Sequence, residues 1–264
     1  MPAVERGRAP LPDVFALVGH PIRWALLSEL SVSDRRVSEL ATALRIPQNG
    51  VSYHLARLRT KGLVTSRRSQ ADGRDAYYTA NLDRYSELIS QAGAGLNPAV
   101  RLVREWPVAD GAFARADRVS VLFLCTGNSA RSQIAEALAG HLGSRLVTPR
   151  SAGSHPKPLH PNAVRVLRVR GIDISDARSK SLEDLTSERF GYVVTLCDRV
   201  RDVCPEFPGN PNAIHWSIPD PAREGSTNAE TYPAFERNVE ELAIRIRYLL
   251  AFIAEHPPSK KHAA

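Results

Sequence analysis

The stretch from residue 119 to residue 138 constrains the fold of this chain more than any other. It begins with an apolar run of strand-forming residues, 119–124, and continues with the polar segment Cys125-Thr-Gly-Asn-Ser-Ala-Arg131-Ser132. From residue 133 to residue 142 the apolar side chains recur at helical spacing. The pattern predicts a strand, a tight loop and a helix that follows the loop directly.

The predicted loop has the composition of an oxyanion site. Its backbone N–H groups and the positive end of the helix dipole face one small concavity, which suits a tetrahedral oxyanion. The same field favours Cys125 as the attacking thiolate, and Arg131 offers a planar set of donors. The alternative is a buried cysteine at a strand end, followed by an ordinary helix cap. We predict that the oxyanion is held by Thr126, Gly127, Asn128, Ser129 and Ala130.

The sequence after this stretch alternates between strand-like and helix-like segments. Strand patterns occupy residues 146–147 with 151–153, and 191–196, whereas helix patterns occupy 162–170, 182–185 and 232–254. Such alternation predicts an α/β domain with a parallel sheet and helices on both faces. The second strand run ends on Cys197, so both Cys125 and Cys197 are expected at the carboxyl ends of strands, where open α/β sheets place their sites.

A third cysteine, Cys204, follows Cys197 by seven residues. In a continuous helix the two thiols share a side, but about 10 Å of axial rise separates them. A disulfide requires Cα atoms within about 7 Å, so a bond between them needs local unwinding. The spacing suits a thiol relay, and the alternative is two incidental buried cysteines.

One acid lies on a segment stiffened by prolines, Pro219-Asp-Pro-Ala222. Asp220 is therefore a candidate general acid for the oxygen that leaves the oxyanion. The plainer interpretation is an aspartate in a surface turn.

The first third of the chain has the pattern of a winged helix-turn-helix. Helices are predicted at 11–19, 21–30 and 37–44, followed by a turn at 45–50. We expect Gln48 or Asn49 in this turn to cap the next helix, which runs through Leu58 to Lys61. Residues 65–79 have the pattern of two strands joined at Ala71-Asp72-Gly73, a hairpin with basic residues near its tip. A helix with a polar and basic free face fits the major groove of DNA, and basic wing residues reach phosphates.

Polar and basic side chains of this helix and hairpin are the predicted DNA contacts. The net charge of +7 agrees with a polyanionic partner but does not specify one. The alternative is solvated charges on an ordinary helical domain. His20 and His54 are far apart in the sequence and lack further ligands, so we expect a structural or DNA-facing role and no metal. The predicted contacts are Gln48, Asn49, Ser52, Tyr53, His54, Arg57, Arg67, Arg68 and Arg74.

The length of 264 residues suits two small domains. We expect a first domain at 1–92, a connector rich in Gly and Pro at 93–118, a second domain at 119–256 and a tail at 257–264. Helical segments are expected at 82–91 and 100–106. Three cysteines do not make a disulfide scaffold, and no run suits a membrane span or a signal peptide, so we expect a cytoplasmic protein without a membrane partner.

The N-terminal domain resembles the ArsR-type bacterial repressors. The similarity implies a homodimer on an inverted-repeat operator, with the helix from Gln48 reading bases. Members that sense arsenite or heavy metals often use a cysteine pair in the helix before the recognition helix, and residues 1–92 hold no cysteine. That sensing site is therefore missing. The similar segments are Gly19-His-Pro-Ile-Arg-Trp-Ala-Leu-Leu27, Val37-Ser-Glu-Leu-Ala41, Val51-Ser-Tyr-His-Leu-Ala-Arg-Leu-Arg59 and Lys61-Gly-Leu-Val64.

The second domain resembles the low-molecular-weight tyrosine phosphatase fold, and more narrowly its thioredoxin-coupled arsenate reductases. The pair Cys197 and Cys204 distinguishes the reductases, because phosphatases of the fold do not need it. The matching segments are Cys125 to Gln133, Ser151-Ala-Gly153, Gly171-Ile-Asp-Ile-Ser175, Val194 to Asp198, Cys204-Pro205, His215-Trp216 and Asp220-Pro-Ala222.

This resemblance implies a relay of three cysteines. Cys125 attacks arsenate held by the loop and Arg131, Ser132 stabilises the thiolate, and Asp220 protonates the departing oxygen. Cys197 then attacks Cys125 and releases arsenite. Cys204 attacks Cys197, and thioredoxin, the external reductant, reduces the Cys197–Cys204 disulfide. No cofactor or metal is expected in the protein itself.

Some relatives bind a potassium ion at a site that matches four positions of this chain. The matching positions are Asn128, Glu136, Ser151 and Lys180, where the relatives have an acid at the last. We expect the Lys180 ammonium to replace the ion, and we predict no potassium dependence.

Three functional hypotheses follow from the sequence. The leading one is a transcriptional regulator of arsenic resistance fused to an arsenate reductase. The second keeps the DNA-binding half and makes the other half a tyrosine phosphatase. The third is a repressor whose C-terminal cysteines hold arsenite as a sensor.

Overall fold

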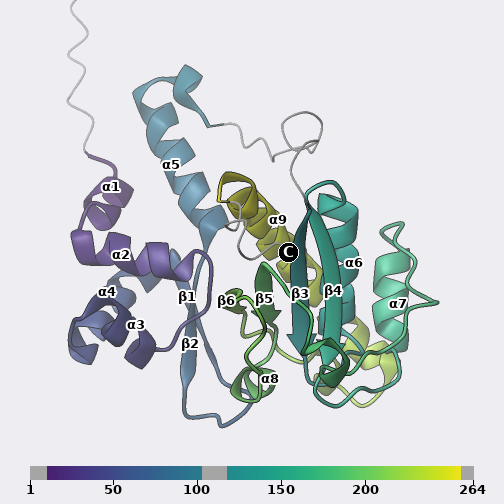
Figure 1. Cartoon of the computed structure of the whole chain (residues 1–264). Coiled ribbons are helices and arrows are strands. Elements are labelled where there is room, and N and C mark those ends of the chain that lie inside the picture. The colour runs from purple at the N-terminus through teal and green to yellow at the C-terminus, as the bar shows by residue number, and fades with distance from the viewer. Residues whose placement is uncertain (1–10, 103–117, 257–264) are drawn as a thin grey trace, which may run out of the picture. The chain divides into compact units, whose positions relative to one another are not determined.

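The computed structural model describes residues 11–102 and 118–256. They form two compact units, an N-terminal helical unit with a β-hairpin and a C-terminal α/β unit (Figure 1). Both predicted fold classes are confirmed.

The N-terminal unit contains the helices and the hairpin of the predicted winged helix-turn-helix. Helices α2 and α3 have the predicted bounds, whereas α1 begins only after Pro12, which is its N-cap. Helix α4 ends shortly before Gly62, whose φ of 71° lies in the left-handed region. The elements are α1 Asp13–Val18, α2 Pro21–Leu30, α3 Val37–Leu44, α4 Gln48–Arg59, β1 Val64–Arg68 and β2 Ala76–Ala80.

These helices pack around one apolar core. Leu26 of α2 and Leu40 of α3 are fully buried, and α4 contributes Val51, Leu55 and Leu58. Burying a leucine side chain contributes about 2 kcal/mol, so this face of α4 is firmly held. The opposite face of α4 therefore stays toward solvent.

The hairpin has the predicted turn. Strands β1 and β2 pair antiparallel in a register that runs from Val64 opposite Ala80 to Arg68 opposite Ala76. Gly73 in the turn has a φ of 69°, a conformation that favours glycine over residues with a Cβ.

Helix α5, Leu82–Leu96, continues five residues beyond its predicted end at 91. It stops where Asn97 becomes extended, because a residue before proline disfavours the helical conformation. A 3-10 turn, η1 Pro98–Val100, follows. Of the helical piece predicted at 100–106, only Val100 is helical; residues 101–102 are irregular and 103–106 lie outside the described residues. The domain boundary predicted at 92 falls inside α5.

The C-terminal unit is built on a parallel sheet with the strand order β4-β3-β5-β6. Leu122, Phe123 and Leu124 of the central strand are fully buried, as expected where both faces of a strand are covered. The sequence analysis missed β6, because this edge strand is short and only its second half is buried. The strands are β3 Val119–Cys125, β4 Val147–Gly153, β5 Tyr192–Thr195 and β6 Asn212–His215.

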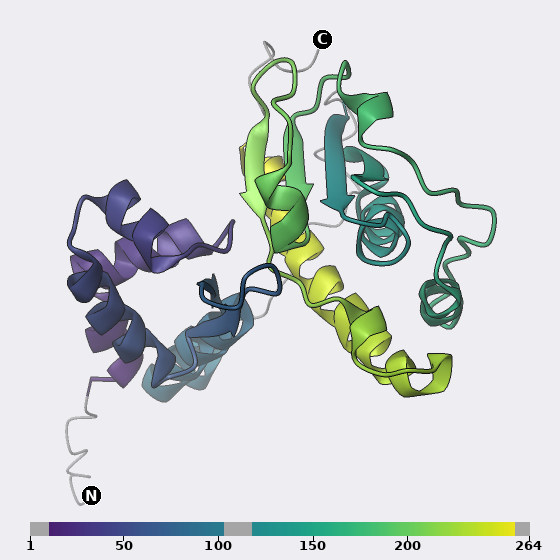
Figure 2. The same cartoon turned by 90° about the horizontal axis from the view of Figure 1, so that it is seen from below.

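Helices α6, α7 and α9 pack together beside this sheet (Figures 1 and 2). Helix α9 begins four residues earlier than predicted, because the Thr227 hydroxyl accepts a hydrogen bond from the Glu230 N–H and caps it. Helix α7 ends two residues early, three residues before Gly171 with its φ of 76°. The elements are α6 Arg131–Gly143, α7 Pro161–Arg168, η2 Glu183–Leu185, α8 Asp198–Asp202, η3 Pro221–Arg223 and α9 Asn228–Glu255.

Candidate active site

The predicted oxyanion loop lies between the end of β3 at Cys125 and the start of α6 at Arg131. A neighbouring strap, residues 154–160, holds the loop from outside. The Thr126 carbonyl accepts a hydrogen bond of 2.8 Å from the His155 N–H, and the Gly127 carbonyl accepts one of 2.9 Å from the Lys157 N–H. At the end of the strap, the His160 N–H donates a hydrogen bond of 2.9 Å to the Ser129 carbonyl.

Because these carbonyls point outward to the strap, backbone N–H groups line the inner side of the loop. In a planar trans peptide the C=O and the following N–H point in opposite directions. With the carbonyls bound to the strap, the N–H groups of the following residues face the inside of the loop. They join the N-terminal end of the thirteen-residue helix α6, which carries partial positive charge. The concavity therefore suits an anion.

Asn128 holds the loop in shape through its side chain. It is fully buried and adopts a φ of 44°, a left-handed conformation that costs energy for a residue with a Cβ. Its Nδ2 donates to the hydroxyls of Ser132 and Ser151, each at 2.8 Å. Its Oδ1 accepts from the Lys180 backbone N–H at 2.7 Å and from Gln133 Nε2 at 3.1 Å. Predicted as an oxyanion contact, Asn128 uses its side chain as a brace.

The candidate nucleophile is buried next to a hydroxyl. The Cys125 side chain is 2% exposed, and its Sγ lies 3.0 Å from the Oγ of Ser132. Ser132 is itself fully buried in the first turn of α6. A hydroxyl at this distance is able to donate to a thiolate, which is the role that the family resemblance implies for Ser132.

The loop arginine contacts the candidate acid. Arg131 is 6% exposed, and its Nη2 lies 3.1 Å from Oδ2 of Asp220. Its Nη1 donates to the Ile218 carbonyl at 2.9 Å. The other oxygen of Asp220 accepts from the Ala222 N–H at 3.3 Å, which caps η3. Arg131 and Asp220, 89 positions apart in the sequence, thus meet at the mouth of the loop.

The second cysteine also lies at the loop. Strand β5 runs parallel to β3, and the Leu196 N–H donates to the Leu124 carbonyl at 2.7 Å. Cys197, the next residue, is 6% exposed, and its Sγ lies 3.3 Å from Oγ1 of Thr126. The fold therefore brings the two strand-end cysteines to the same loop.

Cys204 lies two residues beyond the end of α8 and is half-buried. Its thiol donates weakly to the Pro205 carbonyl at 3.7 Å, and burial raises its pKa to about 11. Helix α8 contains five residues, so it does not run continuously from Cys197 to Cys204 as the spacing argument assumed. All three cysteines are free thiols.

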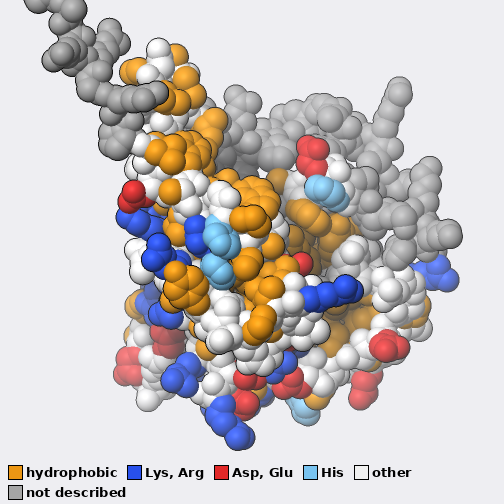
Figure 3. Space-filling model, turned by 90° about the vertical axis from the view of Figure 1, so that its left-hand side faces the viewer, with side chains coloured by type: hydrophobic (Ala, Val, Ile, Leu, Met, Phe, Trp, Pro, Cys, Tyr) orange, Lys and Arg blue, Asp and Glu red, His pale blue; other side chains and the backbone are white. Residues whose placement is uncertain are grey.

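The predicted DNA contacts divide between exposed and buried side chains. On α4 the side chains of Gln48, Asn49, Ser52, Tyr53 and Arg57 are exposed, Tyr53 by 58%. On the hairpin Arg68 and Arg74 are exposed and Arg67 is half-buried. Figure 3 shows a face of the molecule on which basic and apolar side chains are interspersed.

His54, one of the predicted DNA contacts, is buried in the structure. Its side chain is 9% exposed, and its ring packs on that of His20 with centroids 4.6 Å apart. Burial, with His20 and Arg23 nearby, lowers the pKa of His54. The helical spacing places it beside Val51 and Leu55 on the inner side of α4. This position agrees with the structural role that the sequence analysis also allowed for His54.

The strap at 154–160 is the part of the site that sequence reasoning missed. It contributes backbone N–H groups, which every residue except proline has, so no side-chain pattern marks it.

Within the described residues the structure holds no cluster of His, Cys, Asp or Glu suited to a metal ion. No described helix is both long enough and apolar enough to cross a bilayer.

The site combines a thiol at a strand end, a loop whose N–H groups face inward and a buried arginine. These features define a class of α/β protein in which a cysteine acts on a tetrahedral oxyanion. The chain belongs to the low molecular weight phosphotyrosine protein phosphatase family, whose model matches residues 120–257. A second model, that of the MarR family, matches residues 20–75, so a helix-turn-helix domain of a regulator precedes the enzyme domain.

Relatives of the second domain include proteins named arsenate reductase. One from Halalkalibacterium halodurans is 39% identical over 128 residues, which are 48% of this chain and 91% of the relative. One from Bacillus licheniformis is 40% identical over 129 residues, 48% of this chain and 92% of the relative. Among solved structures, a thioredoxin-dependent arsenate reductase of Corynebacterium glutamicum has 26% identity and a TM-score of 0.42, over 86% of this chain and 96% of that chain.

Proposed function

We propose that the protein reduces arsenate to arsenite through a relay of Cys125, Cys197 and Cys204, and that its N-terminal domain regulates arsenic-resistance genes. One observation carries the first part. A second cysteine, Cys197, lies at the oxyanion loop, with its Sγ 3.3 Å from Thr126 Oγ1. Hydrolysis of a phosphoester needs one thiol and water, whereas two-electron reduction needs a second thiol within reach of the first.

In the first step arsenate enters the loop and displaces the Asp220 carboxylate from Arg131. The Cys125 thiolate attacks arsenic, an S–As bond forms, and one As–O bond breaks. Asp220, then free of the arginine, takes up a proton from solvent and delivers it to the departing hydroxyl, which leaves as water. Arsenic remains in the +5 state, and the loop N–H groups hold its other oxygens.

In the second step the Cys197 thiolate attacks Sγ of Cys125. The S–S bond forms as the S–As bond breaks, and the electron pair of that bond stays on arsenic. Arsenic is thereby reduced from +5 to +3 and leaves as arsenite after protonation, while the two thiols are oxidised by two electrons.

In the third step Cys204 attacks Cys197, which frees Cys125 as a thiolate and leaves a Cys197–Cys204 disulfide. Cys197 and Cys204 lie on either side of the short helix α8, and we expect this segment to rearrange when the bond forms. An external dithiol of the thioredoxin type then reduces the disulfide by exchange. The relatives named arsenate reductase support this proposal.

The test is an arsenate assay coupled to thioredoxin and its reductase, on the wild type and on Cys197→Ser and Cys204→Ser. We expect both variants to lose multiple-turnover arsenate reduction. Cys204→Ser should still release one arsenite per chain, because its first two thiols remain. Unchanged arsenate turnover in both variants would reject the relay.

A tyrosine phosphatase is the second candidate, and membership of the phosphatase family favours it. The same loop binds a phosphate ester, and Cys125 attacks phosphorus. The two activities separate in the same variants. Hydrolysis of an aryl phosphate that survives in Cys197→Ser while arsenate reduction is lost supports the reductase. Efficient hydrolysis without any arsenate reduction in the wild type supports the phosphatase.

For the N-terminal domain we propose an ArsR-type homodimer that binds operator DNA through α4. The exposed polar face of this helix and the basic hairpin support DNA binding. The test is a gel shift with DNA from upstream of the protein's own coding region. Arg57→Ala should weaken the complex, and an unchanged affinity would contradict the proposed contact. Release by arsenite that is lost in Cys197→Ser would favour the sensor hypothesis.

A further inference from the structure

A buried pair of ionisable side chains lies next to the second cysteine in the chain. His215, the last residue of β6, is 3% exposed, and Asp198, the first residue of α8, is 5% exposed. Nε2 of His215 lies 3.1 Å from Oδ1 of Asp198. Asp198 directly follows Cys197, so this Asp198–His215 pair is one residue away from the second thiol of the relay. The three steps of the proposed reaction use neither side chain.

Both members of the pair are held in one arrangement. Nδ1 of His215 lies 2.9 Å from Oγ1 of Thr195, the last residue of β5. Burial opposes the ionisation of Asp198, but hydrogen bonds, the strongest from His215, outweigh it and lower its pKa to about 2. Asp198 is therefore a carboxylate, which only accepts, so Nε2 of His215 carries a hydrogen and donates it. A carboxylate buried this deeply requires such a partner.

The pair holds the chain at the point where strand β5 ends. The Leu196 N–H donates to the Leu124 carbonyl of β3 at 2.7 Å, the backbone bond that precedes the turn into α8. Cys197 lies at this turn and is the N-cap residue of α8. Asp198 then connects the first residue of α8 to the end of β6 through His215. Cys197 therefore lies between a backbone bond to one neighbouring strand and a side-chain bond to the other.

The chain at the other end of α8 is held less firmly. None of the side chains of residues 201–206 is buried, and Val203 is 59% exposed. The next buried side chain is Phe207, which packs edge-on against Phe190 with centroids 5.5 Å apart. Exposed segments with few buried contacts open at the lowest cost in free energy. Residues 201–206 are therefore the part of this segment that moves most easily when Cys204 changes its position.

We propose that Asp198 and His215 are positioning residues for Cys197. Their pair keeps the end of β5 in place, so that Cys197 stays at the oxyanion loop and attacks Cys125. Residues 201–206 then move and bring Cys204 to Cys197. The inference rests on the relay of the proposed function, and it makes Cys197 the fixed thiol and Cys204 the moving one.

The test measures two thiol–disulfide equilibria in the full chain, without arsenate. In a Cys204→Ser background, Cys125 and Cys197 form a disulfide while one molecule of oxidised glutathione is reduced to two of glutathione. In a Cys125→Ser background, the same reaction reports on Cys197 and Cys204. Each protein is equilibrated in buffers of reduced and oxidised glutathione, quenched with acid and alkylated. Mass spectrometry then gives the oxidised fraction.

His215→Ala should lower the equilibrium constant of the Cys125–Cys197 disulfide about tenfold, because Cys197 is then no longer held near its partner. Asp198→Ala should have the same effect. The double variant should lose no more than either single variant, as expected for two residues that act as one pair. His215→Gln should restore most of the constant, because its amide N–H replaces the Nε2–H donor. The Cys197–Cys204 equilibrium should not change in these variants, because Cys204 has to move in every one of them.

Asn162→Ala is the matched control, because it also removes a buried polar contact from this domain. Asn162 of α7 is 2% exposed, and its Nδ2 donates to the Asn228 carbonyl at 2.7 Å and to Oγ1 of Thr231 at 3.0 Å. Both partners lie on α9, so the change leaves the Asp198–His215 pair intact. It should lower the free energy of unfolding and leave both equilibria at their wild-type values. The double variant leaves no buried charge without its partner, so it serves as the test if a single variant does not fold.

Several outcomes overturn the proposal. An unchanged Cys125–Cys197 equilibrium in His215→Ala does so, and so does an equal loss in Asn162→Ala, which indicates a general effect of destabilisation. Additive losses in the double variant also do so, because the two residues then act separately. A comparable loss in the Cys197–Cys204 equilibrium does so as well, because the pair then changes the reactivity of Cys197 and not its position. If the wild type reduces no arsenate but the equilibria shift as expected, arsenate reduction is rejected and the positioning of Cys197 is supported.

Discussion

Arg131 and Asp220 form an ion pair at the mouth of the oxyanion loop, with 3.1 Å between Nη2 and Oδ2. The arginine is almost fully buried and also donates to the Ile218 carbonyl, whereas the aspartate is about one-third exposed. The guanidinium that would grip the oxyanion is therefore already bound to a carboxylate of the protein. An entering anion must compete with that carboxylate.

Replacing Asp220 with asparagine should therefore tighten the binding of inorganic phosphate, a non-reacting analogue of arsenate. The amide has the shape of the carboxyl but no charge to hold Arg131. We expect about a fivefold lower Kd, close to 1 kcal/mol for a partly exposed ion pair. Turnover should fall, because the proton donor is lost. Calorimetric titration with phosphate measures the affinity; a weaker or unchanged Kd would contradict competition at Arg131.

Replacing Asn128 with alanine should destabilise the C-terminal domain. The change removes four buried side-chain hydrogen bonds and leaves the left-handed φ of 44° without its stabilising contacts. We expect a loss of about 3 kcal/mol, as for buried groups left unsatisfied. Asn210→Ala is the matched control, because Asn210 has a φ of 53° but is exposed. Denaturant unfolding of both variants should show a clearly smaller loss in the control, and equal losses would refute the role of the side chain.

The reactivity of Cys204 should depend steeply on pH. Burial disfavours its thiolate and raises its pKa to about 11, so at any pH below that value the folded protein holds less thiolate than the unfolded chain. The alkylation rate of Cys204 should rise about tenfold per pH unit from pH 7 to pH 10 in the native protein. In denaturant it should level off earlier. A native profile that levels off by pH 9 would contradict this prediction, because it would show that the Cys204 thiol is mostly exposed to solvent.

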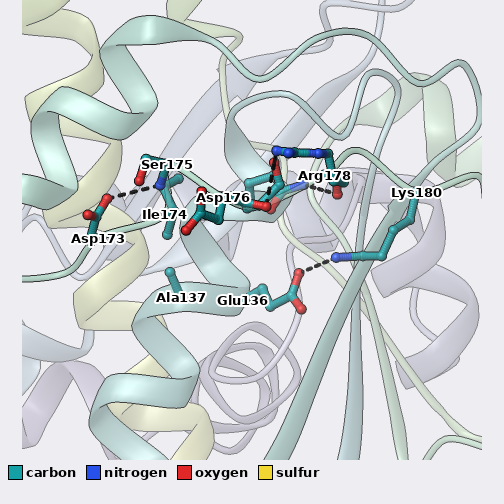
Figure 4. A pocket seen from close by; sticks show the side chains of 10 residues that line it. Glu136, Ala137, Asp173, Ile174, Ser175, Asp176, Arg178 and Lys180 are labelled. Atoms are coloured by element: carbon teal, nitrogen blue, oxygen red, sulfur yellow. Dashed lines mark hydrogen bonds and ion pairs between the residues drawn. The ribbon is translucent and has the colours of Figure 1, made fainter.

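Potassium should not activate the enzyme. Glu136, Ser151 and Asn128 match the potassium ligands of some relatives, and Glu136 binds the Lys180 ammonium at 2.8 Å (Figure 4). The Glu136 carboxylate is therefore already paired with an ammonium group of the protein itself. Turnover measured in potassium chloride and in sodium chloride at equal ionic strength should agree. Clear activation by potassium would contradict this prediction.

Local pattern accounts for much of this molecule. The bounds of α2 and α3 follow from helical spacing and from Pro21, and the end of β3 at Cys125 follows from an apolar run that stops at polar residues. These elements are determined by interactions among residues close in the chain, which a sequence displays directly. Edge strand β6 was missed, because its pairing with β5, and not a pattern of its own, decides it.

The sequence by itself determined the loop with Cys125 and Arg131, the strand-end position of Cys197 and the two-domain plan, since each depends on spacing within a short segment. Tertiary structure alone decided which groups meet. It placed Asp220 against Arg131, turned His54 into the core beside His20, and paired Asp198 with His215 next to Cys197. Such contacts depend on the directions of side chains from elements far apart in the sequence, and the fold sets those directions only when the core has packed.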